Sequence, residues 1–160
     1  MAQKQSTCNK IKVFVIAILI PLAVGALSAF LTKDSMDIYG RINTPPLAPP
    51  SWVFPVVWTV LFILMGVSSA IIYLSDSKIK YDALKIYAVS LALNFCWSLI
   101  FFNLGAYLFA FVWLVILWVF ILLTILEYAK INKTAAYLQI PYLLWVTFAG
   151  YLTFAIYLLN

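Results

Sequence analysis

Residues 37–66 read DIYGRINTPPLAPPSWVFPVVWTVLFILMG, a polar, proline-rich connector that runs directly into an apolar helix. The prolines of the connector are Pro45, Pro46, Pro49 and Pro50. Because proline fixes φ and disfavours helix in the residue before it, the connector is predicted to be a semi-rigid, extended lid. Ser51 is expected to cap the following helix, and Trp58 lies on the first two turns of that helix. A stiff lid beside a tryptophan predicts the cover and wall of a binding site.

The composition of the whole chain indicates an integral membrane protein. Of its 160 residues, 66% are hydrophobic and 9% are charged, and the mean hydropathy is +1.07. A soluble domain of this length has too much surface for its volume to bury so large an apolar area. The formal charge of +5 does not indicate a nucleic-acid partner, because the basic residues occur in short stretches between apolar blocks.

The sequence lacks the residues that metal binding and acid–base catalysis usually require. It contains no histidine, and its two cysteines, Cys8 and Cys96, are too few for a zinc site or a disulfide framework. All five acidic residues lie in connectors or at a helix end. We therefore predict no metal site, no required cofactor and no ordinary catalytic residue, and a proton- or sodium-coupled pump is not expected.

Five apolar segments are long enough to cross a bilayer as helices: residues 13–31, 52–74, 86–104, 106–126 and 135–159. The predicted fold class is therefore an all-α membrane protein. A single domain over residues 1–160 forms a five-transmembrane-helix bundle with the proline-rich lid between helices 1 and 2. A cleaved signal peptide is the alternative for the first segment, but its apolar run is longer than a normal signal core.

The positions of Lys and Arg predict the orientation of this bundle. The N-terminal tail and the 76–85 and 127–133 turns together carry eight of them, whereas the lid side carries only Lys33 and Arg41. Basic residues accumulate on the cytoplasmic side of membrane proteins. The N-terminus is therefore expected in the cytoplasm, with the lid loop and the C-terminus outside.

Aromatic and polar residues follow helical spacing in three of the segments. They are Trp58, Phe62 and Met65; Ser90, Asn94, Trp97, Ser98 and Phe101; and Pro141, Trp145, Ala149 and Leu152. If these faces converge, three indoles line one apolar pocket under the lid, which suits a flat ligand held by stacking and oriented by Asn94. The alternative is that the tryptophans anchor or pack the helices. That role is assigned to Trp52, Trp113 and Trp118.

Four blocks of sequence carry a resemblance to a known family. The blocks are Tyr39 to Pro45 with Pro49-Pro50; Val57-Trp58 with Met65-Gly66; Leu93-Asn94-x-x-Trp97-x-x-x-Phe101-Phe102; and Pro141-Tyr142-Leu143-x-Trp145-x-x-Phe148-Ala149. In this order they resemble the translocator protein/tryptophan-rich sensory protein family, also called TspO/MBR or the peripheral-type benzodiazepine receptor family. The resemblance extends from about Gly25 to Asn160.

The resemblance implies a five-helix bundle, commonly a homodimer, with a pocket closed by the first connector. Ligands of the family include protoporphyrin IX and other tetrapyrroles, cholesterol-like lipids and synthetic isoquinoline carboxamides. Carried over by position, the ligand-binding residues are Tyr39, Trp58, Asn94, Trp97, Phe101, Trp145 and Ala149. Phe62 joins this set because it shares a helix face with Trp58. The residue size at the position of Ala149 affects ligand binding in the family.

The expected protein lies in a bacterial cytoplasmic membrane, in contact with lipid. It is expected to bind a tetrapyrrole, such as protoporphyrin IX, or another flat hydrophobic molecule, for sensing, transport or regulation of porphyrin metabolism. Two alternatives remain open. One is an enzyme in which Trp58 and Trp145 take part in oxidative or light-dependent porphyrin degradation, and the other is a lipid-binding regulatory membrane protein.

The lid departs from the family pattern in two places. Ile38 stands where members often have tryptophan, and Thr44-Pro45-Pro46-Leu47 replaces a common Lys-Pro-x-Trp. Loss of a lid lysine and tryptophan is expected to change the affinity for anionic porphyrins. The C-terminal sterol-recognition pattern of animal members is also incomplete, since no basic residue follows Tyr151 or Tyr157. Cholesterol is therefore not predicted as the native ligand.

Overall fold

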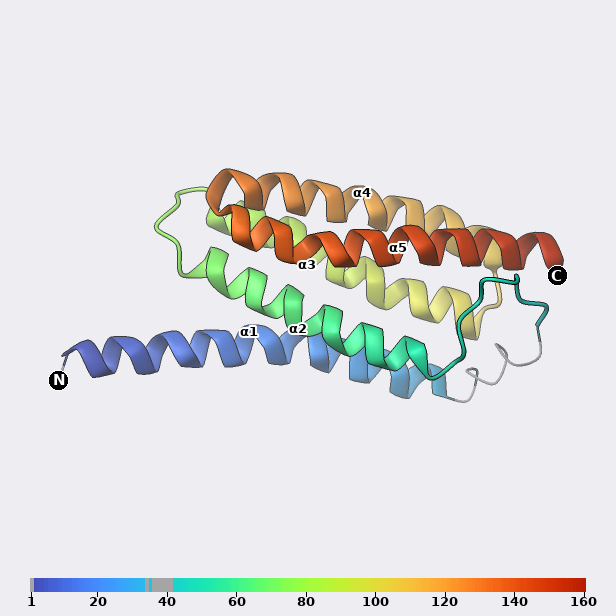
Figure 1. Ribbon diagram of the computed structural model, residues 1–160, viewed down its shortest axis with the longest axis horizontal. Coiled ribbons are helices and arrows are strands. Elements are labelled where there is room, and N and C mark those ends of the chain that lie inside the picture. Colours follow the sequence, from blue (N-terminus) through green and yellow to red (C-terminus); the bar gives the residue numbers. More distant parts are fainter. Residues whose placement is uncertain (1, 34, 36–41) are drawn as a thin grey trace.

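A computed structural model of the chain describes residues 2–33, 35 and 42–160. Figure 1 shows long helices aligned along one axis, with the N-terminus at one end and the C-terminus at the other. The helices are α1 (Ala2–Thr32), α2 (Val53–Tyr73), α3 (Lys80–Ser98), α4 (Tyr107–Ile131) and α5 (Lys133–Leu159), and a π-helical turn, η2 (Leu99–Asn103), continues α3. All five are long and apolar enough to span a membrane, which confirms the predicted bundle.

Four helices extend beyond their predicted bounds, α5 by two residues at its start. α1 begins at Ala2, α3 begins at Lys80 and α4 continues to Ile131, so the charged segments predicted as turns are partly helical. Lysine and glutamate are good helix formers, and a helix can therefore continue past the membrane surface. Two exposed ion pairs at i,i+3 spacing, Lys85–Asp82 (2.9 Å) and Lys130–Glu127 (2.6 Å), support these added turns.

The expected cap of α2 by Ser51 is wrong. The residue at the N-cap of α2 is Trp52, which has helical φ and ψ angles and makes no side-chain capping bond. A turn takes over the function of the cap, because the amide of Val53 donates to the carbonyl of Pro50 at 3.0 Å. A side-chain cap does occur at α5, where Asn132 accepts from the amide of Ala135 at 3.1 Å.

The helices form a closed arrangement in which α5 packs against α2 and α4. α3 packs on the other side of α4, and α1 packs mainly against α2. Apolar side chains from several helices fill the centre, including the fully buried Met65, Ile72, Leu117 and Ile156. α1 is the peripheral helix, because only 11% of its most apolar stretch is buried.

A buried polar group joins α2 to α5 in the half of the bundle nearer the N-terminus. The amide nitrogen of Gln139 donates to the hydroxyl of Ser68 at 3.2 Å, and that hydroxyl donates to the carbonyl of Ala135 at 2.7 Å. Polar groups in hydrocarbon need protein partners, and interhelical bonds of this kind hold membrane helices together. These residues therefore serve the fold.

Two glycines let α1 and α2 approach closely. A Cβ at Gly66 would fall against the Cα of Ile18 and 2.7 Å from the carbonyl oxygen of Ala17, and a Cβ at Gly25 would fall against the ring of Phe62. Small residues at such positions allow helix backbones to meet in a membrane. A third glycine, Gly105, has φ of +58° and lies in the tight return between η2 and α4.

Candidate functional site

A partly enclosed cavity, which we call the main cavity, lies between α1, α2, α3 with η2, and α5. Its volume is about 480 Å³, within the range of ligand pockets. Small and apolar residues of α1 form one wall: Leu22, Gly25, Ala26, Ser28, Ala29 and Thr32. The other walls carry Ser51, Phe54, Pro55, Trp58, Thr59, Phe62, Asn94, Trp97, Ser98, Phe101, Phe102, Ala149, Leu152, Thr153 and Ile156. None of these residues is ionisable.

The fold brings six of the eight predicted ligand-binding residues to this cavity. They are Trp58, Phe62, Asn94, Trp97, Phe101 and Ala149. Tyr39 lies outside the described residues, so its role stays a prediction. The helical spacing of α2 and α3 therefore identified two walls of the cavity from sequence.

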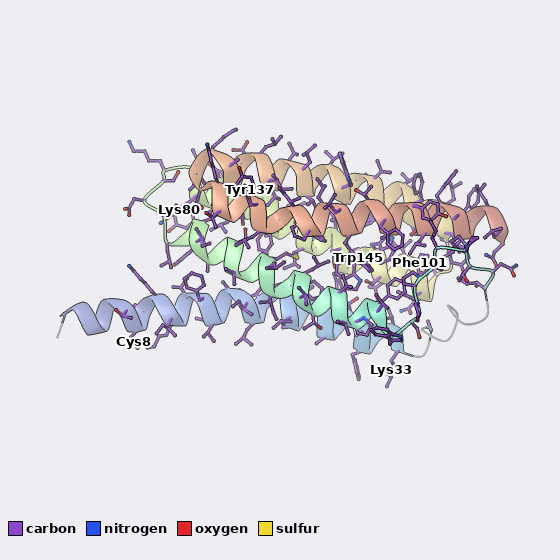
Figure 2. The ribbon with its side chains drawn as sticks, viewed as in Figure 1. Cys8, Lys33, Lys80, Phe101, Tyr137 and Trp145 are labelled. Carbon is purple, nitrogen blue, oxygen red and sulfur yellow. The ribbon has the colours of Figure 1, made fainter. Side chains whose placement is uncertain are left out.

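Trp145 does not line the main cavity. It lines a shallow apolar groove formed by α2 and α5, together with Val60 and Phe148, and its ring lies edge-on to Phe54 with centroids 6.0 Å apart. Positions 145 and 149 differ by about 40° around the axis of α5. With this difference, Ala149 faces the cavity, whereas Trp145 faces the groove on another side of α2. In Figure 2, Phe101 lies near the connector and Trp145 lies farther toward the middle of the bundle.

Two stacked aromatic pairs give the cavity flat walls. The rings of Trp58 and Phe62 are 5.5 Å apart with an angle of 28° between their planes, and Trp97 and Phe101 are 5.4 Å apart at the same angle. Phe102 stands edge-on to Phe101 at 4.9 Å. Offset stacking and edge-to-face contacts are favourable and hold the rings in place. The walls are thus suited to a planar, hydrophobic molecule.

Two hydrogen-bond donors on α3 are buried behind the cavity surface without a well-aligned hydrogen bond, and the side chain of one of them, Asn94, also interacts with the hydroxyl of Tyr142. They are the side-chain amide nitrogen of Asn94 and the indole nitrogen of Trp97. By contrast, Trp113 donates to the carbonyl of Leu93 and Trp118 donates to the hydroxyl of Thr147, each at 2.9 Å. An unpaired donor in a dry environment has a large free-energy cost. Neither donor atom is exposed to the cavity, so other atoms of Asn94 and Trp97 form the cavity surface at these positions.

The proline-rich connector is tied to the end of α5 beside this cavity. The backbone amide of Asn43 donates to the side-chain oxygen of Asn160 at 3.0 Å, and the side-chain nitrogen of Asn160 donates to the carbonyl of Asn43 at 3.0 Å. Ile42 packs against the core, and Pro45 is buried. Figure 1 shows this segment next to the C-terminus. We call the reciprocal Asn43–Asn160 contact the asparagine clasp.

Sequence reasoning did not identify the α1 wall or Phe102. The small residues Gly25, Ser28, Ala29 and Thr32 do recur at helical spacing, but the same pattern is typical of close helix packing. Phe102 reaches the cavity through η2, since a π-helical turn changes the direction of successive side chains. π-Helical turns are frequent at functional sites, but periodicity in sequence does not reveal them.

Comparison with known proteins places this architecture in a family. The model of the TspO/MBR family matches residues 17–159. The chain belongs to the TspO/MBR family. Its relatives include a tryptophan-rich protein TspO of Chlorobaculum tepidum, 43% identical over 87% of this chain and 90% of the relative. The translocator protein of Bos taurus is 31% identical over 85% of this chain and 83% of the relative. The resemblance found in the sequence is thus confirmed.

Proposed function

We propose that this TspO/MBR protein binds a tetrapyrrole such as metal-free protoporphyrin IX in the main cavity, for sensing or transport in a membrane. One observation carries the proposal: two flat aromatic stacks, Trp58–Phe62 and Trp97–Phe101, line one cavity. A porphyrin has a planar apolar ring that stacks on aromatic side chains, and its unprotonated ring nitrogens and carboxylates accept hydrogen bonds.

The absence of histidine from the sequence bears on the form of the ligand. Histidine is a common axial ligand of haem iron, and the lining residues of the cavity offer no metal-binding side chain in its place. We expect metal-free protoporphyrin IX to bind at least as well as haem. A haem complex with the optical spectrum of histidine ligation would contradict the proposal.

The orientation of the protein also belongs to this proposal. The start of α1, the α2–α3 turn and the α4–α5 turn lie at one end of the bundle, and the connector lies at the other (Figure 1). The former end carries most of the lysines, so we place it in the cytoplasm of a bacterial cell and the connector outside. The expected homodimer stays a prediction.

The test is quenching of tryptophan fluorescence by protoporphyrin IX, with the protein in nanodiscs. Wild type should show saturable quenching. Trp97→Phe replaces the larger ring of one stack with a smaller one, so we expect the Kd to rise about two- to tenfold, because an aromatic contact contributes roughly 0.5–1.5 kcal/mol. Trp113→Phe is the matched control, because the indole of Trp113 already bonds to Leu93, and its Kd should stay within about twofold of wild type.

Two results would count against the tetrapyrrole site. Quenching that never saturates in wild type would mean that porphyrin only partitions into the lipid. Equal effects of Trp97→Phe and Trp113→Phe would mean that the cavity is not where the ligand binds. Trp145→Phe distinguishes the arrangement seen here from the predicted one, because Trp145 lies outside the main cavity. We expect it to leave the Kd nearly unchanged.

A second candidate function is light-dependent degradation of the bound porphyrin. The supporting observation is that Trp58 lines the cavity and stacks on Phe62, so a ligand bound in the cavity would meet an indole. Illumination of the complex in air should then give a new product whose formation depends on Trp58. Bleaching at the same rate in wild type and in Trp58→Phe would leave binding as the activity of the protein.

A further inference from the structure

Some residues of the cavity wall are also exposed on the outer surface of the protein. On the two helices they are Ala26 and Ala29 of α1 and Pro55 and Thr59 of α2, and Ser51 joins them in the turn before α2. All lining residues contributed by α3, η2 and α5 are buried or half-buried. A residue that faces both a cavity and the outside marks the mouth of that cavity. The mouth of this cavity therefore lies between α1 and α2.

The facing surfaces of α1 and α2 explain why the mouth is there. On α2, Pro55, Thr59, Phe62 and Gly66 recur at spacings of four, three and four, so they share one helix face. Near the middle and the N-terminal end of the bundle this face meets α1, where Gly66 lies against Ile18 and Phe62 lies against Gly25. Toward the connector the same face is exposed at Thr59 and Pro55. The line of contact between α1 and α2, which we call the α1–α2 seam, is thus closed from Gly25 toward the N-terminus of α1. It is open from Gly25 toward the connector.

The mouth lies at the depth of lipid acyl chains. Thr59 is six residues into α2, or about 9 Å along the helix from its start. The 21 residues of α2 extend over about 31 Å, close to the thickness of the hydrocarbon core. A molecule dissolved among the acyl chains therefore meets the mouth directly, while the connector end of the bundle is held by the asparagine clasp.

The chemistry of the rim suits passage of a flat hydrophobic molecule. Two of its residues are alanines, and the hydroxyl of Thr59 donates to the carbonyl of Pro55 at 2.7 Å, so this polar group is already paired. The closely packed part of the α1–α2 contact, at Gly25 and Gly66, lies away from the rim, so α1 and α2 need not separate there for a ligand to pass. Both features favour exchange of an apolar ligand with the lipid phase.

We propose that the α1–α2 seam is a lateral portal through which a membrane-dissolved tetrapyrrole enters and leaves the cavity, with Ala26, Ala29, Pro55 and Thr59 as its rim. The inference rests on the proposed function, because it assumes that the cavity holds such a ligand. It adds the route: the ligand comes from the lipid and passes between two helices, and the connector stays in place during exchange.

The experiment closes the portal reversibly. Ala29→Cys and Thr59→Cys are combined in a Cys8→Ser, Cys96→Ser background and bridged with a short reagent that forms reducible disulfides. Protein in nanodiscs is mixed with vesicles loaded with protoporphyrin IX, and the quenching of tryptophan fluorescence is followed in time. The bridge should slow both association and dissociation at least tenfold with little change in Kd, and a reductant should restore both rates.

Control variants distinguish the effect of the bridge from the effects of modifying one cysteine and of adding a bulky side chain. Each single-cysteine variant treated with the same reagent should slow exchange no more than Ala29→Phe does, because one adduct narrows the rim without bridging it. Leu27→Phe and Ile63→Phe add a ring at exposed positions of α1 and α2 that do not line the cavity. These two substitutions should leave the exchange rate unchanged. Ala29→Phe, which narrows the rim, should slow exchange several-fold.

The competing route runs past the connector. In that case Asn43→Ala and Asn160→Ala, which break the asparagine clasp, would accelerate exchange, and the bridged protein would exchange at the wild-type rate. That pair of results would overturn the portal while leaving the binding site intact. A wild-type protein with no saturable porphyrin binding at equilibrium would instead reject the proposed function, and the portal with it.

Discussion

Ala149→Trp is expected to abolish saturable binding of protoporphyrin IX, with an affinity loss of more than about 100-fold, or roughly 3 kcal/mol. Ala149 is buried and lines the main cavity from α5, opposite the walls that carry Trp58 and Trp97. An indole at this position would occupy the space between the aromatic stacks. Because that space is only about 480 Å³, a porphyrin ring and an added indole cannot share it. Equilibrium quenching in nanodiscs measures the effect.

Leu158→Trp is the matched control for this substitution. It adds the same side chain to α5, but at a position that is 67% exposed and does not line the cavity. It should bind like wild type, and both variants should elute as folded protein in size-exclusion chromatography. Binding by folded Ala149→Trp within about threefold of wild type would place the ligand outside this cavity.

Gly66→Ala is expected to destabilise the protein by about 1–3 kcal/mol, although alanine is usually the better helix residue. The added methyl would fall against the Cα of Ile18 and 2.7 Å from the carbonyl oxygen of Ala17. Both contacts are backbone atoms of α1, so relief requires α1 to move away from α2. Thermal unfolding in detergent should show a clear drop in Tm, and the α1–α2 seam should loosen.

Gly150→Ala provides the comparison for Gly66→Ala. The methyl at this position would meet only the side chain of Leu114 at 3.5 Å, an ordinary van der Waals contact. The gain in helix propensity should then dominate, with a neutral effect or a stabilisation of about 0.5–1 kcal/mol. Equal changes in Tm for the two variants would show that the close approach of α1 and α2 does not limit stability.

The sequence by itself determined that the chain is a five-helix membrane bundle. Hydrophobicity summed over about 20 residues decides whether a segment crosses a bilayer, and this sum needs no knowledge of neighbouring helices. Helical periodicity also placed Trp58 with Phe62, and Asn94 with Trp97 and Phe101, because residues three or four apart share a face wherever the helix lies. Residues on these faces line the cavity.

Only the tertiary structure decided which faces of the other helices meet the cavity-lining faces of α2 and α3. Trp145 has the spacing of a pocket residue, yet the rotation of α5 relative to α2 turns it into a separate groove. Gly25 and Ala29 belong to one small-residue stripe, but one packs under Phe62 and the other borders the mouth. Helix rotation and separation depend on interlocking side chains from several helices at once, whereas periodicity describes a single helix.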